Sequence, residues 1–181
     1  GTNYPSRTSF VETGIPFINA GHLRNGLIDL EDMNFITQER FGLLSNGKIQ
    51  QKDFLFCLRG SLGKYGSVGD LSEGAIASSL VIIRCEALIL HDFMNAYLGG
   101  HICQEMISFS MNGAAQPNLA AASVKQLKIP LPPLEEQKRI AGILNEQMAA
   151  VEEAKKAAQE RLEAAQALPA AYLREVFPSS E

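Results

Sequence analysis

Residues Gly42–Lys48 have the glycine and lysine spacing of a phosphate-binding loop, in which backbone N–H groups and the lysine hold nucleotide phosphates. Such a loop needs a serine or threonine after the lysine to bind Mg²⁺, and Ile49 stands in that place. A phosphate-binding loop also follows a strand, whereas the preceding residues Thr37–Phe41 favour a short helix. We therefore predict that this stretch is a turn leading into a strand over Gln51–Leu58, and that it binds no nucleotide.

A second catalytic pattern, Ser61-Leu-Gly-Lys64, matches the Ser-x-x-Lys nucleophile of penicillin-binding proteins. The Ser-Asp-Asn and Lys-Thr-Gly motifs that complete such a site do not follow it. The nearby glycines at 60, 63, 66 and 69 do not have dinucleotide-binding spacing, and they are typical of turns between strands. We predict no nucleophilic catalysis here.

The residue types that can bind metals are scattered along the chain. His22, His91 and His101 are too dispersed for a metal site, so we expect each to be an ordinary surface or core residue. The cysteines are odd in number and lie among apolar neighbours, which favours buried, reduced thiols over disulfides or a zinc site. They are Cys57, Cys85 and Cys103. We therefore predict a non-enzyme without metal or cofactor, in a reducing cytoplasm.

The composition allows one domain with a real core and an appendage, since the chain has 181 residues of which 46% are hydrophobic. We expect a soluble protein, because no run of 18 apolar residues and no signal peptide is evident. The chain opens at Gly1 without methionine, so we expect a truncated form or a segment of a longer polypeptide.

The net charge of −4 argues against nonspecific nucleic-acid binding by bulk electrostatics. The excess acid is mainly C-terminal, because residues 1–130 hold ten basic and eleven acidic residues and residues 131–181 hold six and nine. A nearly neutral domain can still bind DNA through a local basic face. That requires convergence in space of some of the basic residues Arg7, Arg24, Arg59, Lys64 and Arg84.

Residues 1–112 favour an α+β domain of short strands and helices. Apolar runs predict strands at Ile15–Asn19, Phe54–Arg59 and Ser79–Cys85. Short helical patterns cover Thr37–Phe41 and, as one or two helices, His91–Asn112.

The stretch Gly113–Asn145 has a distinct order of local features. Asn118 is placed to cap a short helix through Gln126, and Leu127–Leu131 alternates like a half-buried edge strand. Pro132 and Pro133 end that strand, and the sequence Pro-Leu-Glu-Glu that follows favours the start of a helix at Leu134. We therefore divide the chain into a domain over residues 1–132 and a long helix over residues 133–181.

The helical region has the spacing of a coiled-coil seam, with apolar residues alternately four and three apart. The seam consists of Ile140, Leu144, Gln147, Val151, Ala154, Ala158, Arg161, Ala165, Leu168 and Tyr172. We expect Pro169 to kink or restart the helix. The partner helix belongs either to a second copy or to another segment of a larger protein; the alternative is that the stripe folds back on its own domain.

The stretch Gly113–Asn145 resembles the segment that joins a target recognition domain to its spacer helix in specificity subunits of type I restriction–modification enzymes. The matching runs are Gln116–Leu119, Ile129–Leu134 and Glu135–Ala141. Weaker matches extend the resemblance over nearly the whole chain, at Thr2–Arg7, Gly14–Ile18, Lys52–Phe56 and Arg59–Lys64. Lys52 stands where glycine is usual in that family, a departure that bears on the local turn and not on the fold.

The resemblance implies a non-catalytic subunit that recognises double-stranded DNA and carries methyltransferase subunits, joined by a restriction subunit. S-adenosylmethionine, ATP and Mg²⁺ are then expected only on those partners. One recognition domain and one helix make half of a usual subunit, so we expect a homodimer through antiparallel helices and a target that is an interrupted palindrome. If the chain was instead cut from a two-domain subunit, the target is asymmetric.

The chemistry of side chains gives the candidate DNA contacts, because homology does not identify them. Arginine and lysine bind guanine or phosphate, asparagine and glutamine pair with adenine, and hydroxyl groups bind phosphate. The candidates are Arg7, Arg24, Asn25, Arg59, Ser61, Lys64, Tyr65, Ser78 and Gln116. A turn or helix cap is the alternative role for Gln116 and Asn118. Two other functions stay open: the C-terminal target domain of a single-chain restriction–methyltransferase, and a coiled-coil adaptor without DNA binding.

Overall fold

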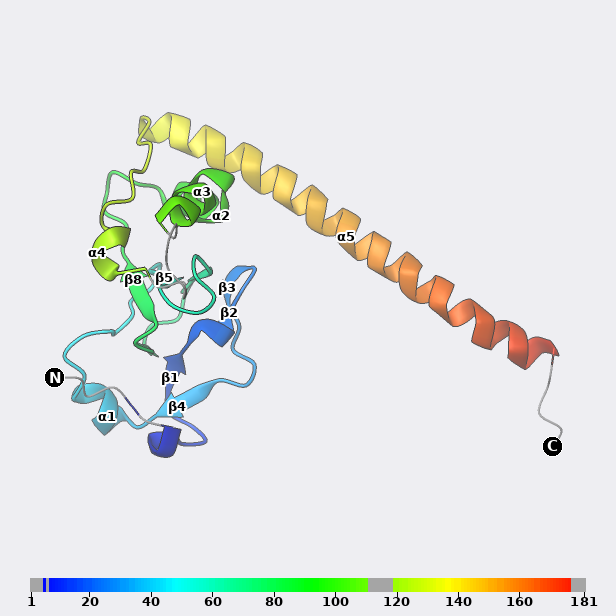
Figure 1. Ribbon diagram of the computed structural model, residues 1–181, viewed down its shortest axis with the longest axis horizontal. Coiled ribbons are helices and arrows are strands. Elements are labelled where there is room, and N and C mark those ends of the chain that lie inside the picture. Colours follow the sequence, from blue (N-terminus) through cyan, green and yellow to red (C-terminus); the bar gives the residue numbers. More distant parts are fainter. Residues whose placement is uncertain (1–4, 6, 111–118, 177–181) are drawn as a thin grey trace. The chain divides into compact units, whose positions relative to one another are not determined.

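A computed structural model of the chain describes residue 5 and residues 7–110 and 119–176. It confirms the α+β class with a long C-terminal helix (Figure 1). The chain divides into two compact units, Gly1–Lys138 and Arg139–Glu181.

The strands are β1 (Ile15–Ile18), β2 (Leu23–Arg24), β3 (Gly26–Ile28), β4 (Asn34–Ile36), β5 (Phe54–Cys57), β6 (Tyr65–Ser67), β7 (Ala75–Ile76) and β8 (Leu80–Ile83). The helices are α1 (Gln38–Gly42), α2 (His91–Gly99), α3 (His101–Ser110), α4 (Ala121–Val124) and α5 (Leu134–Val176), with 3-10 turns η1 (Arg7–Ser9) and η2 (Ala20–His22).

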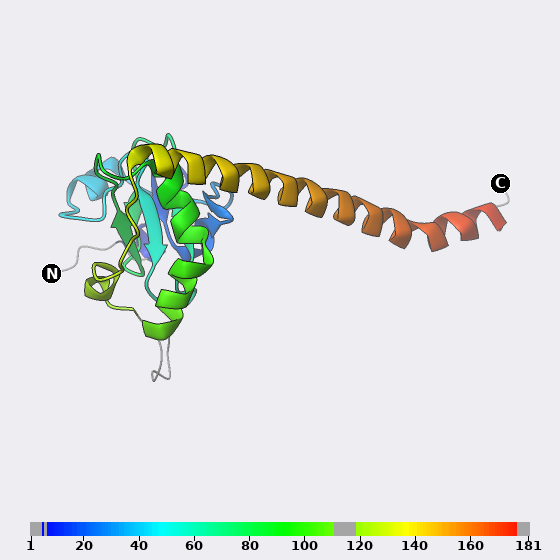
Figure 2. The same ribbon diagram turned by 90° about the horizontal axis from the view of Figure 1, so that it is seen from above.

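The first unit is built in layers around β5. A five-stranded sheet has the order β2-β3-β6-β5-β8, and a three-stranded sheet has the order β4-β1-β7. Along β5, Phe54 and Phe56 pack in a cluster with Met94 and Leu98 of α2, whereas Leu55 packs with residues of β1 and β7. Figure 2 shows α2 and α3 following one another along the sheet. Strand β5 is therefore buried on both faces, as its unbroken apolar run predicts.

Several of the elements predicted from apolar runs and caps are confirmed. Strands β1, β5 and β8 lie inside the three predicted ranges, and α2 and α3 occupy the region expected to hold one or two helices. Helix α1 begins after Thr37, whose hydroxyl accepts a 3.2 Å hydrogen bond from the backbone N–H of Arg40. Helix α5 begins at Leu134 with Glu135 and Glu136 in its first turn, as the dipole argument predicts.

The prediction of a strand over Leu127–Leu131 is wrong. Residues 127–133 do not form a strand, although Leu127 and Ile129 are half-buried and Lys128 and Pro130 are exposed. The alternation therefore reflects packing of side chains against the core and not pairing of the backbone. The short helix before it is also smaller than expected, since α4 begins at Ala121 with Ala120 at its N-cap. Asn118 lies outside the described residues.

Helix α5 continues through Pro169 to Val176, so the expected restart does not occur. Figure 2 shows its axis bending over the last turns, drawn in orange and red. A proline inside a helix removes one backbone hydrogen bond and clashes with the carbonyl four residues earlier, and a bend relieves this clash.

Candidate nucleic-acid interface

Three turns leave the same end of the five-stranded sheet. Strands β5 and β6 are antiparallel with Phe56 opposite Tyr65, so the turn between them follows the end of β5. Strand β3 runs parallel to β6, and β8 runs antiparallel to β5, which places the start of β3 and the start of β8 at this end as well. We call the turns at residues 24–26, 58–64 and 77–79 together the turn end. It brings together six predicted contacts: Arg24, Asn25, Arg59, Ser61, Lys64 and Ser78.

The first turn is a tight hairpin between β2 and β3. Asn25 and Gly26 have φ angles of 51° and 75°, the left-handed conformation of both central residues in a type I′ turn. Arg24 is exposed, and its Nη1 lies 2.7 Å from a carboxylate oxygen of Asp29. The sequence Asn-Gly therefore fixes the shape of the tip, and Asp29 fixes the direction of the arginine.

The second turn, between β5 and β6, packs on α3. A Cβ atom added to Gly63 would lie 3.0 Å from Ile107 and 3.1 Å from Gln104, so only glycine fits easily. Lys64 Nζ donates a 3.1 Å hydrogen bond to the carbonyl of Ala20. Arg59 and Ser61 are exposed, and no residue that the structure describes pairs with the Arg59 guanidinium. Arg59 is therefore a cation available to an external anion.

Of the remaining predicted contacts, Tyr65 is engaged by a hydrogen bond within the domain. The Tyr65 hydroxyl donates to the carbonyl of Asn95 at 3.1 Å, and burial raises the pKa of this phenol. Arg7 belongs to η1, and the position of its side chain is not described. Gln116 lies outside the described residues.

Arg84 does not join the basic turns. Its guanidinium donates two hydrogen bonds of 2.7 Å to Asp53, which precedes β5 at the opposite end of that strand. This hydrogen bonding raises the pKa of Arg84. Arg84 is therefore part of the framework of the domain.

The apparent phosphate-binding loop Gly42–Lys48 has a structural role. Lys48 Nζ donates to the carbonyl of Gly42 at 3.3 Å and lies 4.9 Å from the centre of the Phe41 ring. Ile49 is buried in the core. The lysine of the apparent phosphate loop is thus held by its own turn.

Sequence reasoning missed the role of Gln137, a polar residue that is only 1% exposed. Its Nε2 donates to the carbonyls of Leu88 and Pro132, each at 2.9 Å, and its Oε1 accepts from the N–H of Leu90 at 2.9 Å. These bonds fasten the first turn of α5 within the first unit. The only signal was the place of Gln137 inside the run Glu135–Ala141.

Helix α5 carries an exposed apolar stripe. Leu144, Val151, Leu168 and Tyr172 of the predicted seam are exposed, with Tyr172 at 68%. Met148 and Leu162 are exposed beside the same seam, which the strict four-three spacing did not include. The stripe is therefore wider than predicted, and the dimerisation role of these residues stays a prediction.

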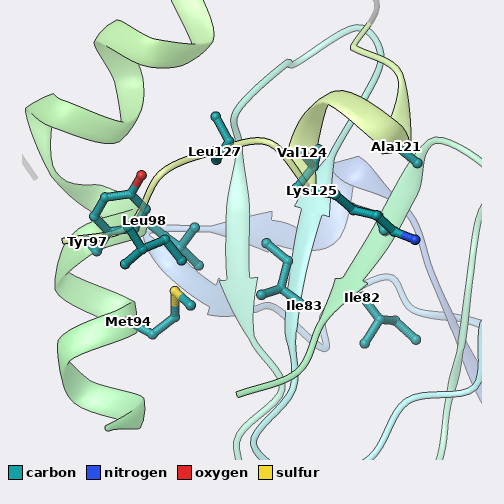
Figure 3. A pocket seen from close by; sticks show the side chains of 11 residues that line it. Ile82, Ile83, Met94, Tyr97, Leu98, Ala121, Val124, Lys125 and Leu127 are labelled. Carbon is teal, nitrogen blue, oxygen red and sulfur yellow. The ribbon is translucent and has the colours of Figure 1, made fainter. Parts of the chain in front are cut away.

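A separate cavity of about 240 Å³ lies between β8, α2, α4 and residues 127–129 (Figure 3). Its wall is mostly apolar and includes Val81, Ile83, Met94 and Leu98. It lacks the clustered donors that bind phosphate, so we do not assign it to the interface.

The three cysteines are free thiols, of which Cys57 and Cys103 are buried and Cys85 is half-buried. Burial raises the pKa of Cys103 to about 11. Within the described residues, no three His, Cys, Asp or Glu side chains are grouped to hold a metal. None of the helices described has the length and hydropathy required for a membrane span.

The fold and this site define a class of α+β domain whose exposed polar turns gather at one end of a sheet and whose C-terminus is a long helix. The chain belongs to the type I restriction modification DNA specificity domain family, whose model matches residues 4–163. This finding confirms the resemblance seen in the sequence.

Two curated relatives are specificity subunits from Escherichia coli. The chain is 29% identical over 147 residues to the type I restriction enzyme EcoKI specificity subunit of strain K12, covering 78% of this chain and 31% of that protein. It is 26% identical over 131 residues to the EcoBI specificity subunit, covering 72% and 28%. The match thus spans about a third of the length of these relatives.

Two solved structures share the fold. One comes from a study of complex assembly and conformational transition of the type I R-M system, with a TM-score of 0.74 and 23% identity. The other is the HsdS subunit from Thermoanaerobacter tengcongensis, with a TM-score of 0.66 and 21% identity. In both cases the similarity covers 93% of this chain and 45% of the other.

Proposed function

We propose that this chain is a non-catalytic DNA sequence-recognition and scaffold subunit of a type I restriction–modification system. The observation that carries the proposal is the convergence of Arg24, Asn25, Arg59 and Lys64 at the turn end, in a chain of the DNA specificity domain family. Arginine and lysine bind phosphate and guanine, and asparagine pairs with adenine. The turn end therefore offers both kinds of contact that sequence recognition needs.

The negative net charge does not oppose this function. Electrostatic attraction between exposed charges is screened beyond about 8 Å at physiological salt, so the local charge at the interface decides binding. Arg59 is exposed at the turn end, whereas much of the excess acid lies after residue 130. We expect binding to depend strongly on salt, because each phosphate contact releases counterions.

The partners we propose are double-stranded DNA, methyltransferase subunits and a restriction subunit, in the cytoplasm. The names of the two curated relatives, which are specificity subunits of type I restriction enzymes, support this set. S-adenosylmethionine, ATP and Mg²⁺ then belong to the partner subunits.

The exposed stripe of α5 supports pairing with a second helix. In an antiparallel pair of two copies, the seam places Leu144 opposite Leu168, and the small residues Ala154 and Ala158 meet near the twofold axis. Such a dimer holds two recognition domains and predicts an interrupted palindrome. A second half of a longer subunit, supplied in place of the second copy, predicts an asymmetric target.

Selection from a randomised pool of duplexes tests recognition. The full chain, alone or assembled with its methyltransferase subunits, is expected to enrich one motif and to bind it at least a thousandfold more tightly than unrelated DNA. Absence of any enriched motif would contradict the proposal. The symmetry of the motif distinguishes two copies from two different halves.

Sedimentation tests the pairing of α5. A Val151→Lys variant places a charge in the seam and is expected to shift a dimer toward monomer. Ala149→Lys, an exposed change on the opposite side of the helix, is the matched control and should leave the dimer intact. A wild-type chain that sediments as a monomer at all concentrations would exclude the homodimer.

A further inference from the structure

We infer that the β2–β3 hairpin contacts bases in the major groove, and that Leu27 is a specificity-determining residue that packs against the methyl group of a thymine. The inference rests on the proposed function and adds to it the element that enters the groove and the base it recognises.

The pairing of the hairpin separates its residues between two faces. Leu23 and Ile28 are directly opposite one another, as are Arg24 and Leu27. Opposite residues of an antiparallel pair point to the same face. Leu23 is fully buried in the core, whereas Leu27 is 62% exposed. Arg24 and Leu27 therefore form a side-by-side polar and apolar pair on the outward face.

Tyr65 supports the tip of the hairpin against α2. The Tyr65 hydroxyl, bound to the carbonyl of Asn95, would lie 3.0 Å from a Cβ at Gly26 and 2.6 Å from one at Gly99. The two glycines thus allow the phenol to fit between the tip of the hairpin and α2. Tyr65 is in this view a positioning residue, and the tip is ordered before DNA binds.

The outward face has the chemistry of a major-groove contact. A two-stranded ribbon fits that groove, arginine recognises guanine, and an apolar side chain packs on the thymine methyl group. The 2.7 Å contact with Asp29 occupies one nitrogen of the Arg24 guanidinium and directs the group along the strand. Its other N–H groups stay available for a base, with Leu27 next to them.

Deoxyuridine tests the inference, because it differs from thymidine only by the missing methyl group. The full chain is first used to select its target duplex, and each thymine is then replaced by deoxyuridine in turn. We expect one position per half-site to lower the affinity about fourfold, the effect of burying one methyl group. A Leu27→Ala variant should bind the thymine and deoxyuridine duplexes equally well.

A Leu43→Ala variant is the matched control, since Leu43 is 56% exposed and follows α1, outside the hairpin. It should keep the wild-type sensitivity to deoxyuridine. If a target is selected but contains no methyl-sensitive thymine, or if Leu27→Ala keeps that sensitivity, the inference is wrong and the proposed function stands. If no target is selected, the proposed function itself fails.

Discussion

The carboxylate of Asp53, only 1% exposed, accepts hydrogen bonds of 2.7 Å from both Nε and Nη2 of Arg84. A third bond of 2.7 Å comes from the backbone N–H of Gln50. The pair joins the residue before β5 to the residue after β8, so it closes one end of the sheet opposite the turns.

Removing the arginine should destabilise the domain. Arg84→Ala leaves a buried carboxylate with one remaining donor, and because Arg84 is itself half-exposed we expect a cost of about 2 kcal/mol. Urea unfolding at neutral pH measures it. The double variant Asp53→Asn, Arg84→Ala should cost less than the sum of the single variants, and strictly additive costs would show that the two side chains do not interact.

Lys52 has a φ angle of 65°, a conformation that favours glycine. Residues with a Cβ atom are strained in this conformation by about 1–2 kcal/mol. Glycine relieves the strain, but its greater freedom in the unfolded chain cancels part of the gain in stability. Lys52→Gly should therefore stabilise the domain by up to about 1 kcal/mol in urea unfolding. Lys52→Ala, which keeps the Cβ atom, should give no such gain; equal stabilisation by both would point to the lysine charge.

The stability should fall at alkaline pH. Burial raises the pKa of the Cys103 thiol from 9.0 to about 11, so the unfolded chain loses this proton first. The contribution of the protonated Cys103 thiol to folding stability is complete below pH 9 and is lost as the pH rises to about 11. Unfolding followed from pH 8 to 11 should show the decline, and Cys103→Ala should make it shallower. Tyr65 and Tyr97, whose pKa values burial also raises, add to the decline and leave a slope in the variant.

Gln137 should be sensitive to truncation. Gln137→Ala leaves the N–H of Leu90 and two carbonyls without their partner, for an expected cost of about 2–3 kcal/mol. Hydrogen exchange at Leu90 and thermal unfolding measure the effect. The control is Gln166→Ala, an exposed change outside the seam of the same helix, and a similar loss there would mean that the hydrogen bonds of Gln137 are not responsible.

Arg59→Ala should weaken binding to the selected duplex by about 1–3 kcal/mol if Arg59 contacts a guanine, and should relax the preference at that position. A phosphate contact would instead weaken binding to all sequences and reduce its salt dependence. Lys52→Ala removes a cation next to Asp53, beyond the other end of β5, and should leave affinity unchanged. Unchanged affinity in Arg59→Ala would remove that residue from the interface.

Local sequence features predicted much of the fold. The start of α5 follows from Pro133, Leu134 and the two glutamates, and α1 follows from the Thr37 cap, because helix ends are encoded by neighbouring residues. Strand β5 follows from its apolar run. The error at Leu127–Leu131 has a physical cause: alternation reports which side chains are buried, whereas a strand also needs a neighbouring backbone, and the sequence does not contain that information.

The candidate site was predictable only in its residue types. Arg24, Arg59 and Lys64 were chosen for their chemistry, but their gathering at one end depends on the parallel pairing of β3 with β6, which joins segments about forty residues apart. The separation of Arg84 from them depends on Asp53, a long-range partner. The Asn-Gly pair at residues 25 and 26 is a clear local signal for a hairpin, although the apolar runs alone predict no strands there.

Strand β5 lies between a packed, hydrogen-bonded region at its start and exposed turns at its end. At its start, His91 stacks on Phe54 and the adjacent Leu90 is bound by Gln137, whereas the exposed turns follow its end. Substitutions in those turns leave untouched the hydrogen bonds of Gln137 that hold the start of α5. A lineage can therefore change the surface chemistry of these turns by exchanging a few exposed residues while the attachment of α5 is inherited unaltered.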